Sequence, residues 1–170
     1  MYQVGDLVLY GTTGVCRVVD IAQKDLTGKG NQLYYHLAPL YQSCTISAPV
    51  DSPKIFIRPI ISREEADCLI DQLPSLSGQG YATGVPRELT ERYEAALNTH
   101  SCMELARLVA SIYNKKQEFE QKKRRISAID ERYMKRAEEL LHGELAAALG
   151  LEKQDIPDYI QSRIQKAAEA

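Results

Sequence analysis

The sequence has 170 residues, of which 44% are hydrophobic and 26% charged, a composition typical of a globular protein and not of a disordered or fibrous one. No stretch approaches the roughly 18 uncharged apolar residues that a membrane helix needs, and the N-terminus lacks the basic and then apolar order of a secretion signal. We therefore expect a cytoplasmic protein. The cysteines Cys16, Cys44, Cys68 and Cys102 form no C-x-x-C pair, so we expect buried thiols and neither a zinc site nor a disulfide framework.

The formal net charge of −2 hides an uneven distribution. Residues 101–135 carry nine Lys or Arg against five Asp or Glu, while the segments on either side of them are acidic. The cations include an uninterrupted run at residues 122–125. Such a concentration is typical of a surface that binds phosphates. The alternative is a solvated helix face on which the cations pair with Glu118 and Glu120.

The first third of the chain is predicted to form a small sheet, because short β-type runs alternate with turn residues and helical periodicity is absent. Pro49 restricts the fourth strand to an edge or exit position, since proline cannot donate to a ladder. In the second strand, strict alternation places Val15, Arg17, Val19 and Ile21 on one face and Cys16 and Val18 on the other. The expected strands are residues 6–10, 15–21, 33–37, 44–50 and 55–58. Five such strands predict a small, Tudor-like, partly open barrel.

After Ile61 the pattern becomes helical, which makes the predicted fold class α+β with an all-α helical bundle in the second part. Capping boxes at Ser62, Ser101 and Ser127 mark three helix starts, and Gly150 is placed to end a helix in the left-handed conformation. The expected helices are residues 63–73, 87–97, 101–124, 127–149 and 155–168. Residues 74–86 are rich in Pro, Gly and Ser, as linkers are. We expect a β domain at 1–60, a helix and flexible linker at 61–86, and a helical domain at 87–170.

Constellations typical of catalysis are missing. His36, His100 and His142 lie far apart in the sequence without an acidic partner at motif spacing, and H-E-x-x-H, G-x-S-x-G and P-loop motifs are absent. The glycine-rich residues 78–84 have the wrong spacing for a dinucleotide loop and follow a helix, not a strand. We therefore expect no enzymatic activity, no metal and no cofactor. An enzyme with a pocket lined by the histidines or cysteines is the remaining alternative.

Two sets of motifs, one in each part of the chain, together resemble a known family. The first set comprises VGDLVLY at 4–10, Gly14-Val15, YYHL at 34–37, ISAPV at 46–50 and Ile57-Arg58. The second set comprises Arg92-Tyr93 and the run 127–137 that continues into 141–146. The first set is similar to the RNA-polymerase-interacting domain of the CarD/CdnL family of bacterial transcription regulators, and the second to the helical DNA-binding domain of that family. The sheet module alone also occurs in transcription-repair coupling factors.

The resemblance implies that the β domain docks on the β subunit of RNA polymerase by strand addition to an unpaired sheet edge. The fourth strand and the facing third strand are the candidates for that edge. Ser47 lies where the best-known relatives carry an interface arginine, and Lys24 is a candidate basic partner. The polymerase-binding residues that the resemblance implies are Lys24, Cys44, Thr45, Ile46, Ser47, Ala48 and Pro49.

The resemblance also implies that the helical domain contacts promoter DNA at the upstream edge of the melted region and stabilises the open complex. Relatives carry a tryptophan that wedges into the minor groove; this sequence has no Trp, and Leu89 falls at that position. Tyr81 or Tyr93 could replace the wedge, and Leu89 could instead belong to the core. The implied DNA-binding residues are Arg87, Leu89, Arg92, Lys122, Lys123, Arg124, Arg125, Arg132 and Lys135. We expect a monomer that associates with the nucleoid through polymerase and with no membrane; the alternative is a polymerase-binding adaptor whose helical domain binds a protein.

Overall fold

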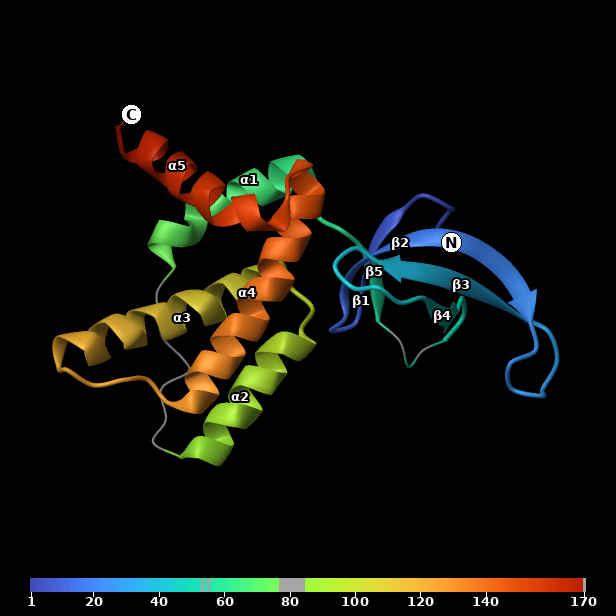
Figure 1. Cartoon of the computed structure of the whole chain (residues 1–170), viewed down its shortest axis with the longest axis horizontal. Coiled ribbons are helices and arrows are strands. Elements are labelled where there is room, and N and C mark those ends of the chain that lie inside the picture. Colours follow the sequence, from blue (N-terminus) through green and yellow to red (C-terminus); the bar gives the residue numbers. More distant parts are fainter. Residues whose placement is uncertain (53, 55, 77–84, 170) are drawn as a thin grey trace. The chain divides into compact units, whose positions relative to one another are not determined.

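The computed structural model describes residues 1–52, 54, 56–76 and 85–169, and the chain divides into two compact units, Met1–Ile60 and Ile61–Ala170. The first unit contains an antiparallel sheet of five strands, and the second contains the helices (Figure 1). The predicted α+β class, with a small β module before a helical bundle, is therefore confirmed.

The strands of the first unit form an open sheet in the order β4-β3-β2-β1-β5, with every neighbouring pair antiparallel. They are β1 (Leu7–Tyr10), β2 (Gly14–Lys24), β3 (Gln32–Pro39), β4 (Ile46–Pro49) and β5 (Ile57–Pro59). Figure 1 shows β2 and β3 as a long curved ribbon. The prediction that Pro49 confines its strand to an edge is confirmed. The third strand, expected as part of the same edge, instead lies inside the sheet between β2 and β4.

A bulge in β2 changes the predicted orientation of its side chains. The register with β3 shifts between Val18 and Asp20, which leaves Val19 as an extra residue that is 44% exposed. Alternation restarts after the bulge, so Ile21 packs with Cys16 and Val18 against the same core. The prediction that Ile21 lies on the face opposite to Cys16 and Val18 is wrong for this reason. The core of this unit consists of Val8, Cys16, Val18, Tyr35, Leu37 and Ala48.

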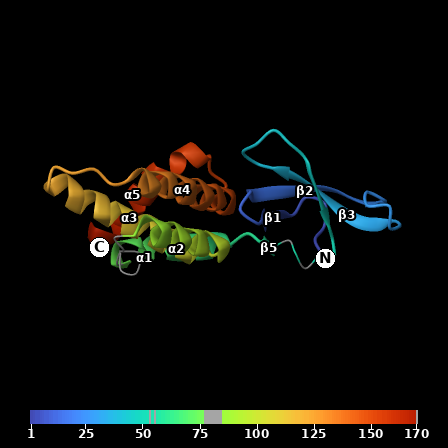
Figure 2. The ribbon, with the colours of Figure 1, turned by 90° about the horizontal axis from the view of Figure 1, so that it is seen from below.

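The second unit consists of five α-helices and two short 3-10 helices among its described residues. They are α1 (Arg63–Gln72), η1 (Leu73–Ser75), α2 (Pro86–Asn98), α3 (Cys102–Gln121), α4 (Ala128–Leu149), η2 (Lys153–Asp155) and α5 (Ile156–Glu169). Helices α2, α3 and α4 pack against one another, and α5 packs against α1 and α4 (Figures 1 and 2). Their shared core includes Ile70, Leu97, Leu108, Ile112 and Leu145.

Local capping residues define most of the helix ends. The predicted capping boxes form at α1 and α4, where a serine and an acidic residue three positions later satisfy each other's backbone N–H groups. The capping box predicted at Ser101 forms only in part. Ser101 accepts from the N–H of Glu104, but the Glu104 carboxylate lies 3.0 Å from the guanidinium of Arg107. Gly150 ends α4 with a φ of 68°, as predicted.

Helix α3 ends earlier than the predicted Arg124, at Gln121. Lys123 has a φ of 55°, and its N–H donates to the carbonyl of Glu120 at 3.0 Å. The N–H of Arg124 donates to the carbonyl of Phe119 at 2.7 Å. These two bonds form a Schellman motif with lysine at the position where glycine is usual. The run of four cations consequently lies in the loop between α3 and α4 and not on a helix.

The start of the second unit is bound to α4. The N–H of Ile61 donates to Oε2 of Glu144 at 2.9 Å, and Glu144 is only 1% exposed. Arg63 donates from Nη2 to the carbonyl of Leu149 at 2.6 Å. Helix α1 therefore lies within the second unit, whereas we expected it to belong with the linker between the two domains. Residues 77–84 of that linker lie outside the described residues.

Candidate interaction surfaces

The edge strand β4 points part of its main chain away from the sheet. The N–H of Val50 donates to the carbonyl of Leu33 at 3.0 Å. This bond shows which residues of β4 point their main-chain groups at β3. In an antiparallel pair, residues alternate between pointing both main-chain groups at the partner strand and pointing both away. The groups of Ile46 and Ala48 therefore point to β3, whereas the N–H and C=O of Ser47 point outward.

Pro49 also occupies an outward position, where its missing N–H removes no bond to β3. The β4 edge thus presents a donor and an acceptor at Ser47 and an acceptor at Pro49. A second strand could pair with these groups.

The opposite edge, β5, is largely closed. The N–H of Gly11 donates to the carbonyl of Phe56 at 2.8 Å, so Ile57 and Pro59 are the residues of β5 that point away from β1. The carbonyl of Ile57 accepts from the hydroxyl of Tyr2 at 3.4 Å. The carbonyl of Pro59 accepts from Arg58 at 2.9 Å, and Pro59 has no N–H. Among the residues that the structure describes, β4 is therefore the edge that is open for strand addition.

The residues predicted to bind polymerase differ in their exposure. Ala48 is fully buried and Ile46 packs against the core, so their side chains stabilise the sheet. Ser47 is exposed, and its Oγ lies 3.2 Å from Nδ1 of His36. Lys24 is exposed at the end of β2. Cys44 and Thr45 are also exposed and precede β4, whereas the predicted strand included them.

The expectation of four buried thiols is wrong for two of the cysteines. Cys16 and Cys102 are buried, whereas Cys44 and Cys68 are exposed. Burial raises the pKa of Cys16 to about 11, with a smaller contribution from nearby Cys44. Cys102 donates from its thiol to Oε1 of buried Glu144 at 2.9 Å. These two thiols have structural surroundings, and the other two face solvent.

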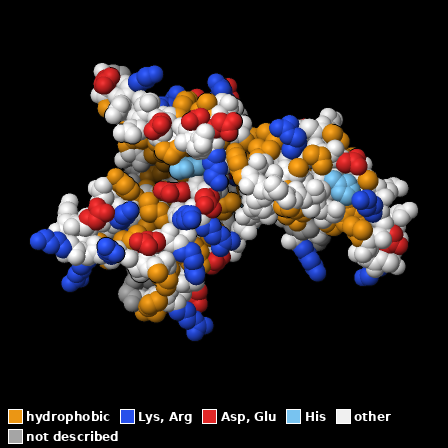
Figure 3. Space-filling model, viewed as in Figure 1, with side chains coloured by type: hydrophobic (Ala, Val, Ile, Leu, Met, Phe, Trp, Pro, Cys, Tyr) orange, Lys and Arg blue, Asp and Glu red, His pale blue; other side chains and the backbone are white. Residues whose placement is uncertain are grey.

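In the second unit, cationic side chains gather at the loop from α3 to α4. Lys122, Lys123, Arg124 and Arg125 are all exposed. Figure 3 shows Lys and Arg side chains around the tip where α3 ends, with acidic side chains between them. Arg124 and Arg125 also line a hollow together with Lys116, Glu120, Ile126 and Glu131. The hollow therefore has three cations against two carboxylates.

The other predicted DNA-binding cations lie on α2 and α4, and all are exposed. Arg87 pairs with Glu91 one turn away at 3.4 Å. The guanidinium of Arg132 lies 5.0 Å from the centre of the Tyr133 ring, which its charge favours. Arg92 lies on α2, and Lys135 lies on α4, one turn after Arg132.

The two predicted wedge residues of α2 are in the core. Leu89 is 4% exposed and Tyr93 is 1% exposed, and both belong to the hydrophobic cluster of the helical unit. The structure thus agrees with the alternative prediction for Leu89, as a core residue. Its side chain is not presented to a base step. Tyr81 lies outside the described residues.

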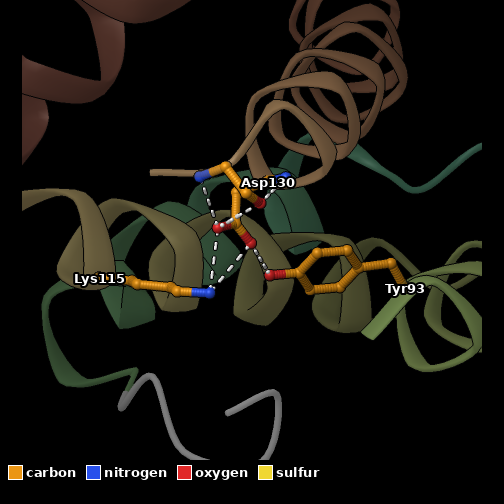
Figure 4. A network of polar contacts seen from close by, with 4 residues as sticks. Tyr93, Lys115 and Asp130 are labelled. Atoms are coloured by element: carbon orange, nitrogen blue, oxygen red, sulfur yellow. Dashed lines mark hydrogen bonds and ion pairs between the residues drawn. The ribbon is translucent and has the colours of Figure 1, made fainter. Parts of the chain in front are cut away.

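A buried carboxylate joins the three helices next to the cationic loop (Figure 4). Asp130, at the start of α4, is fully buried. Its Oδ1 accepts from the hydroxyl of Tyr93 on α2 at 2.6 Å, and its Oδ2 lies 3.0 Å from Nζ of Lys115 on α3. Its Oδ2 also accepts from the backbone N–H of Ser127 at 3.2 Å and from the Ser127 hydroxyl at 3.0 Å. One side chain therefore ties the end of the loop to α2 and α3.

These contacts decide the protonation of Asp130. Burial on its own would raise the pKa of this carboxyl. The hydrogen bonds from Tyr93, Lys115 and Ser127, together with the charge of Lys115, outweigh burial and hold the pKa of Asp130 below its usual value. The sequence pattern identified Asp130 only as the partner of Ser127 in a capping box. Its contacts with Tyr93 and Lys115 are tertiary, and no local spacing indicates them.

Comparison with known families identifies the first unit. Residues 2–61 match the family model described as the CarD-like/TRCF RID domain. The first unit is therefore a CarD-like/TRCF RID domain. The RID domain indicates an RNA-polymerase-interacting protein, and it is a binding domain and not a catalytic one. No curated protein matches the chain. The match does not include the helical unit, and the similarity of that unit to the DNA-binding domain of the CarD/CdnL family stays a prediction.

The described part of the chain holds neither a membrane-spanning helix nor a cluster of metal ligands. Within residues 1–52, 54, 56–76 and 85–169, none of the helices is long and apolar enough to cross a membrane. Over the same ranges, no three His, Cys, Asp or Glu side chains are grouped so that they could hold a metal ion.

Proposed function

We propose that this CarD-like protein docks through the β4 edge of its RID domain on the β subunit of RNA polymerase and contacts promoter DNA through its helical unit. The contact with DNA lies near the upstream edge of the melted region and modulates the stability of the open complex. The observation that carries the proposal is the RID match at residues 2–61 on a sheet with one open edge.

The contrast between the two sheet edges supports docking through β4. Strand addition needs outward N–H and C=O groups that nothing else has taken. Ser47 offers both groups at the middle of β4, whereas Tyr2 and Arg58 take the outward carbonyls of β5. The exposed Ser47 side chain and Lys24 then lie on the polymerase-binding side, where they contribute specificity.

The position of the cationic loop supports DNA binding by the helical unit. Its four cations are exposed, and the Schellman turn at Lys123 and the Asp130 contacts fix the two ends of the loop. Cations held in place on a folded surface bind the phosphates of DNA with little sequence preference. Docking on polymerase then raises the effective concentration of this weak contact at a promoter.

A polymerase-binding adaptor is the second candidate function. Burial of Leu89 and Tyr93 favours it, because neither residue is presented as an apolar wedge for DNA. The carboxylates of Glu120 and Glu131 beside Arg124 and Arg125 also reduce the attraction for phosphates. The adaptor predicts no salt-dependent affinity for duplex DNA.

The docking site is tested with Ser47→Pro in the full-length chain. The change removes the outward N–H of β4 and leaves the bonds to β3 intact. Binding to the polymerase β subunit should therefore weaken by about tenfold, because one hydrogen bond contributes about 1–1.5 kcal/mol. Ser47→Ala keeps that N–H and removes only the side-chain hydroxyl, so it should weaken binding by less than Ser47→Pro does. Ile46→Pro would remove a bond to β3 and is therefore a control for damage to the sheet. Unchanged binding by Ser47→Pro would exclude the β4 edge.

The DNA contact is tested with the Arg124→Ala, Arg125→Ala double variant. Duplex affinity is measured at several salt concentrations, and the slope of log affinity against log salt should fall by about two, one for each cation that no longer binds a phosphate. Lys166→Ala removes an exposed cation of α5 and is the matched control. If the original chain binds duplex DNA without any dependence on salt, or does not bind it, the adaptor is the better description. Promoter opening by polymerase is measured in parallel with the same variants.

A further inference from the structure

The exposed face of α3 holds an aromatic side chain that the proposed function does not use. Tyr113 is 50% exposed. Among the described aromatic residues of the helical unit it is the exposed one, since Tyr93 and Tyr133 are buried and Phe119 and Tyr159 are partly buried. Large exposed aromatic rings are unfavourable in water and are common at binding surfaces. Tyr113 is therefore available to contact a ligand.

The Tyr113 side chain is held on the helix surface. Gln117, one turn further along α3, donates from Nε2 to the Tyr113 hydroxyl at 2.7 Å. Residues four positions apart lie on the same face of a helix. The bond fixes the direction of the ring, so a ligand that stacks on it would have less side-chain entropy to remove.

Tyr113 shares a face of α3 with two residues of the hollow at the cationic loop. Lys116 follows Tyr113 by three residues and Glu120 follows it by seven, so all three lie along one face of α3. Lys116 and Glu120 line the hollow together with Arg124 and Arg125. From Tyr113 to Glu120 the helix advances by about 10 Å. The ring and the cations of the hollow thus lie within the reach of one short DNA strand.

We propose that Tyr113 stacks on an unpaired DNA base while Arg124 and Arg125 bind the backbone of the same strand. The inference rests on the proposed function and adds the class of ligand, a single strand or a frayed end, to it. Every base has a π face, so stacking on tyrosine tolerates any sequence. Bases inside an intact duplex stack on each other, and a single ring on a helix surface cannot reach them. Because the hollow also contains two carboxylates, its cations alone attract a strand weakly, and the ring supplies the missing affinity.

The test compares two DNA probes by fluorescence anisotropy with the full-length chain. One is an oligothymidine of about 12 nucleotides, within the range of sites that single-stranded DNA occupies on small domains, and the other is a blunt duplex. Tyr113→Ala should weaken binding of the oligothymidine at least about fivefold, the lower end of what one stacked base contributes. Duplex binding should stay within about twofold, because phosphate contacts carry it. Tyr113→Phe keeps the ring and should bind both probes within about twofold of the original chain.

The outcomes separate this inference from the function on which it rests. If Tyr113→Ala binds the oligothymidine like the original chain, or if the original chain does not bind it, the stacking role is overturned. Loss of duplex affinity in the Arg124→Ala, Arg125→Ala variant would still support the proposed function in that case. If the original chain binds neither probe, the proposed DNA contact fails as well. Thermal unfolding of Tyr113→Ala should match that of the original chain because the side chain is exposed.

Discussion

The hydroxyl of Tyr93 lies 2.6 Å from Oδ1 of Asp130, a carboxylate that is fully removed from solvent. The same carboxylate lies 3.0 Å from the ammonium group of Lys115, a side chain that is 27% exposed. A buried charge is stable only when hydrogen bonds and an opposite charge replace water around it. The start of α4 and the loop before it are therefore fixed by a polar contact as well as by apolar packing.

Substitution of Asp130 should destabilise the helical unit. Asp130→Asn keeps the shape of the side chain but removes the charge that Lys115 and Tyr93 contact, so the free energy of unfolding in urea should fall by about 2–3 kcal/mol. Tyr93→Phe removes one hydroxyl donor and should lower it by about 1–2 kcal/mol. Glu131→Gln, at the next and exposed position, is the matched control. Equal stability of Asp130→Asn and the control would contradict a structural role for the carboxylate.

Acid should weaken the same contact. Because the folded-state pKa of Asp130 is lowered, its stabilising contribution is present above the unfolded pKa of about 3.9 and is lost as the pH falls through the folded value. Urea unfolding measured between neutral pH and pH 3 should therefore show a smaller loss of stability in Asp130→Asn than in the original chain. Asp158→Asn, on the exposed part of α5, is the control and should lose as much stability at acid pH as the original chain does. Parallel curves for the original chain and Asp130→Asn would speak against this assignment.

His142 should make stability depend on pH in a higher range. Burial lowers the pKa of His142, and the charge of Lys153 lowers it further. As the pH falls below the ordinary value of 6.5, the unfolded chain takes up a proton that the folded chain does not, so the free energy of unfolding decreases. His142→Gln should reduce this decrease, as followed by the helical circular dichroism signal. His36→Gln, in the other unit, should show the same decrease as the original chain. If His36→Gln removed the decrease, the pH dependence would not belong to His142.

Substitution of Lys123 should separate the effect of its backbone conformation on stability from the effect of its charge on DNA binding. Lys123 adopts a φ of 55°, a conformation that is unfavourable for residues with a Cβ and natural for glycine. Lys123→Gly should therefore raise the free energy of unfolding by roughly 0.5–1 kcal/mol and should lower the salt slope of duplex binding by about one. Lys123→Ala removes the same charge but keeps a Cβ in the left-handed conformation. It should therefore lower the salt slope of duplex binding without raising the free energy of unfolding. A destabilised Lys123→Gly would indicate that the lysine side chain stabilises the turn.

The thiols should react in two classes. Cys44 and Cys68 are exposed and should be alkylated rapidly by iodoacetamide in the folded protein, whereas Cys16 and Cys102 should react only after unfolding in urea. Burial of Cys16 and its pKa of about 11 both suppress its thiolate at neutral pH. Peptide mass spectrometry assigns the sites. Rapid labelling of Cys16 under native conditions would show that β2 opens locally.

Much of the fold was predictable because its signals are local. Each strand of the sheet is bounded by turn residues, and Pro49 identified the edge because a missing donor is visible in the sequence. Serine caps with acidic partners indicated the starts of α1 and α4, and Gly150 indicated the end of α4. In each of these cases the residue that determines the structure lies within a few positions of the feature that it determines.

The features that the sequence did not predict have no local signal. The bulge at Val19 replaces strict alternation without a glycine or proline to mark it, and α3 ends at a lysine that occupies a left-handed conformation. The hydrogen bond between Tyr93 and Asp130 spans 37 positions of the chain. The exposure of Cys44 and the placement of α1 also depend on tertiary packing. Candidate site residues were identified by type, but their exposure, and hence the exclusion of Leu89, required the structure.

The unequal edges of the sheet determine how far strand pairing can spread. Fibrillar assembly needs every chain to accept a neighbour on both sides, and here Tyr2 and Arg58 occupy one of the two sides. If two copies paired through their β4 strands, both open edges would be covered. A third copy would then have no open edge with which to pair. A sheet with a single open edge can thus pair with a partner strand without polymerising with itself.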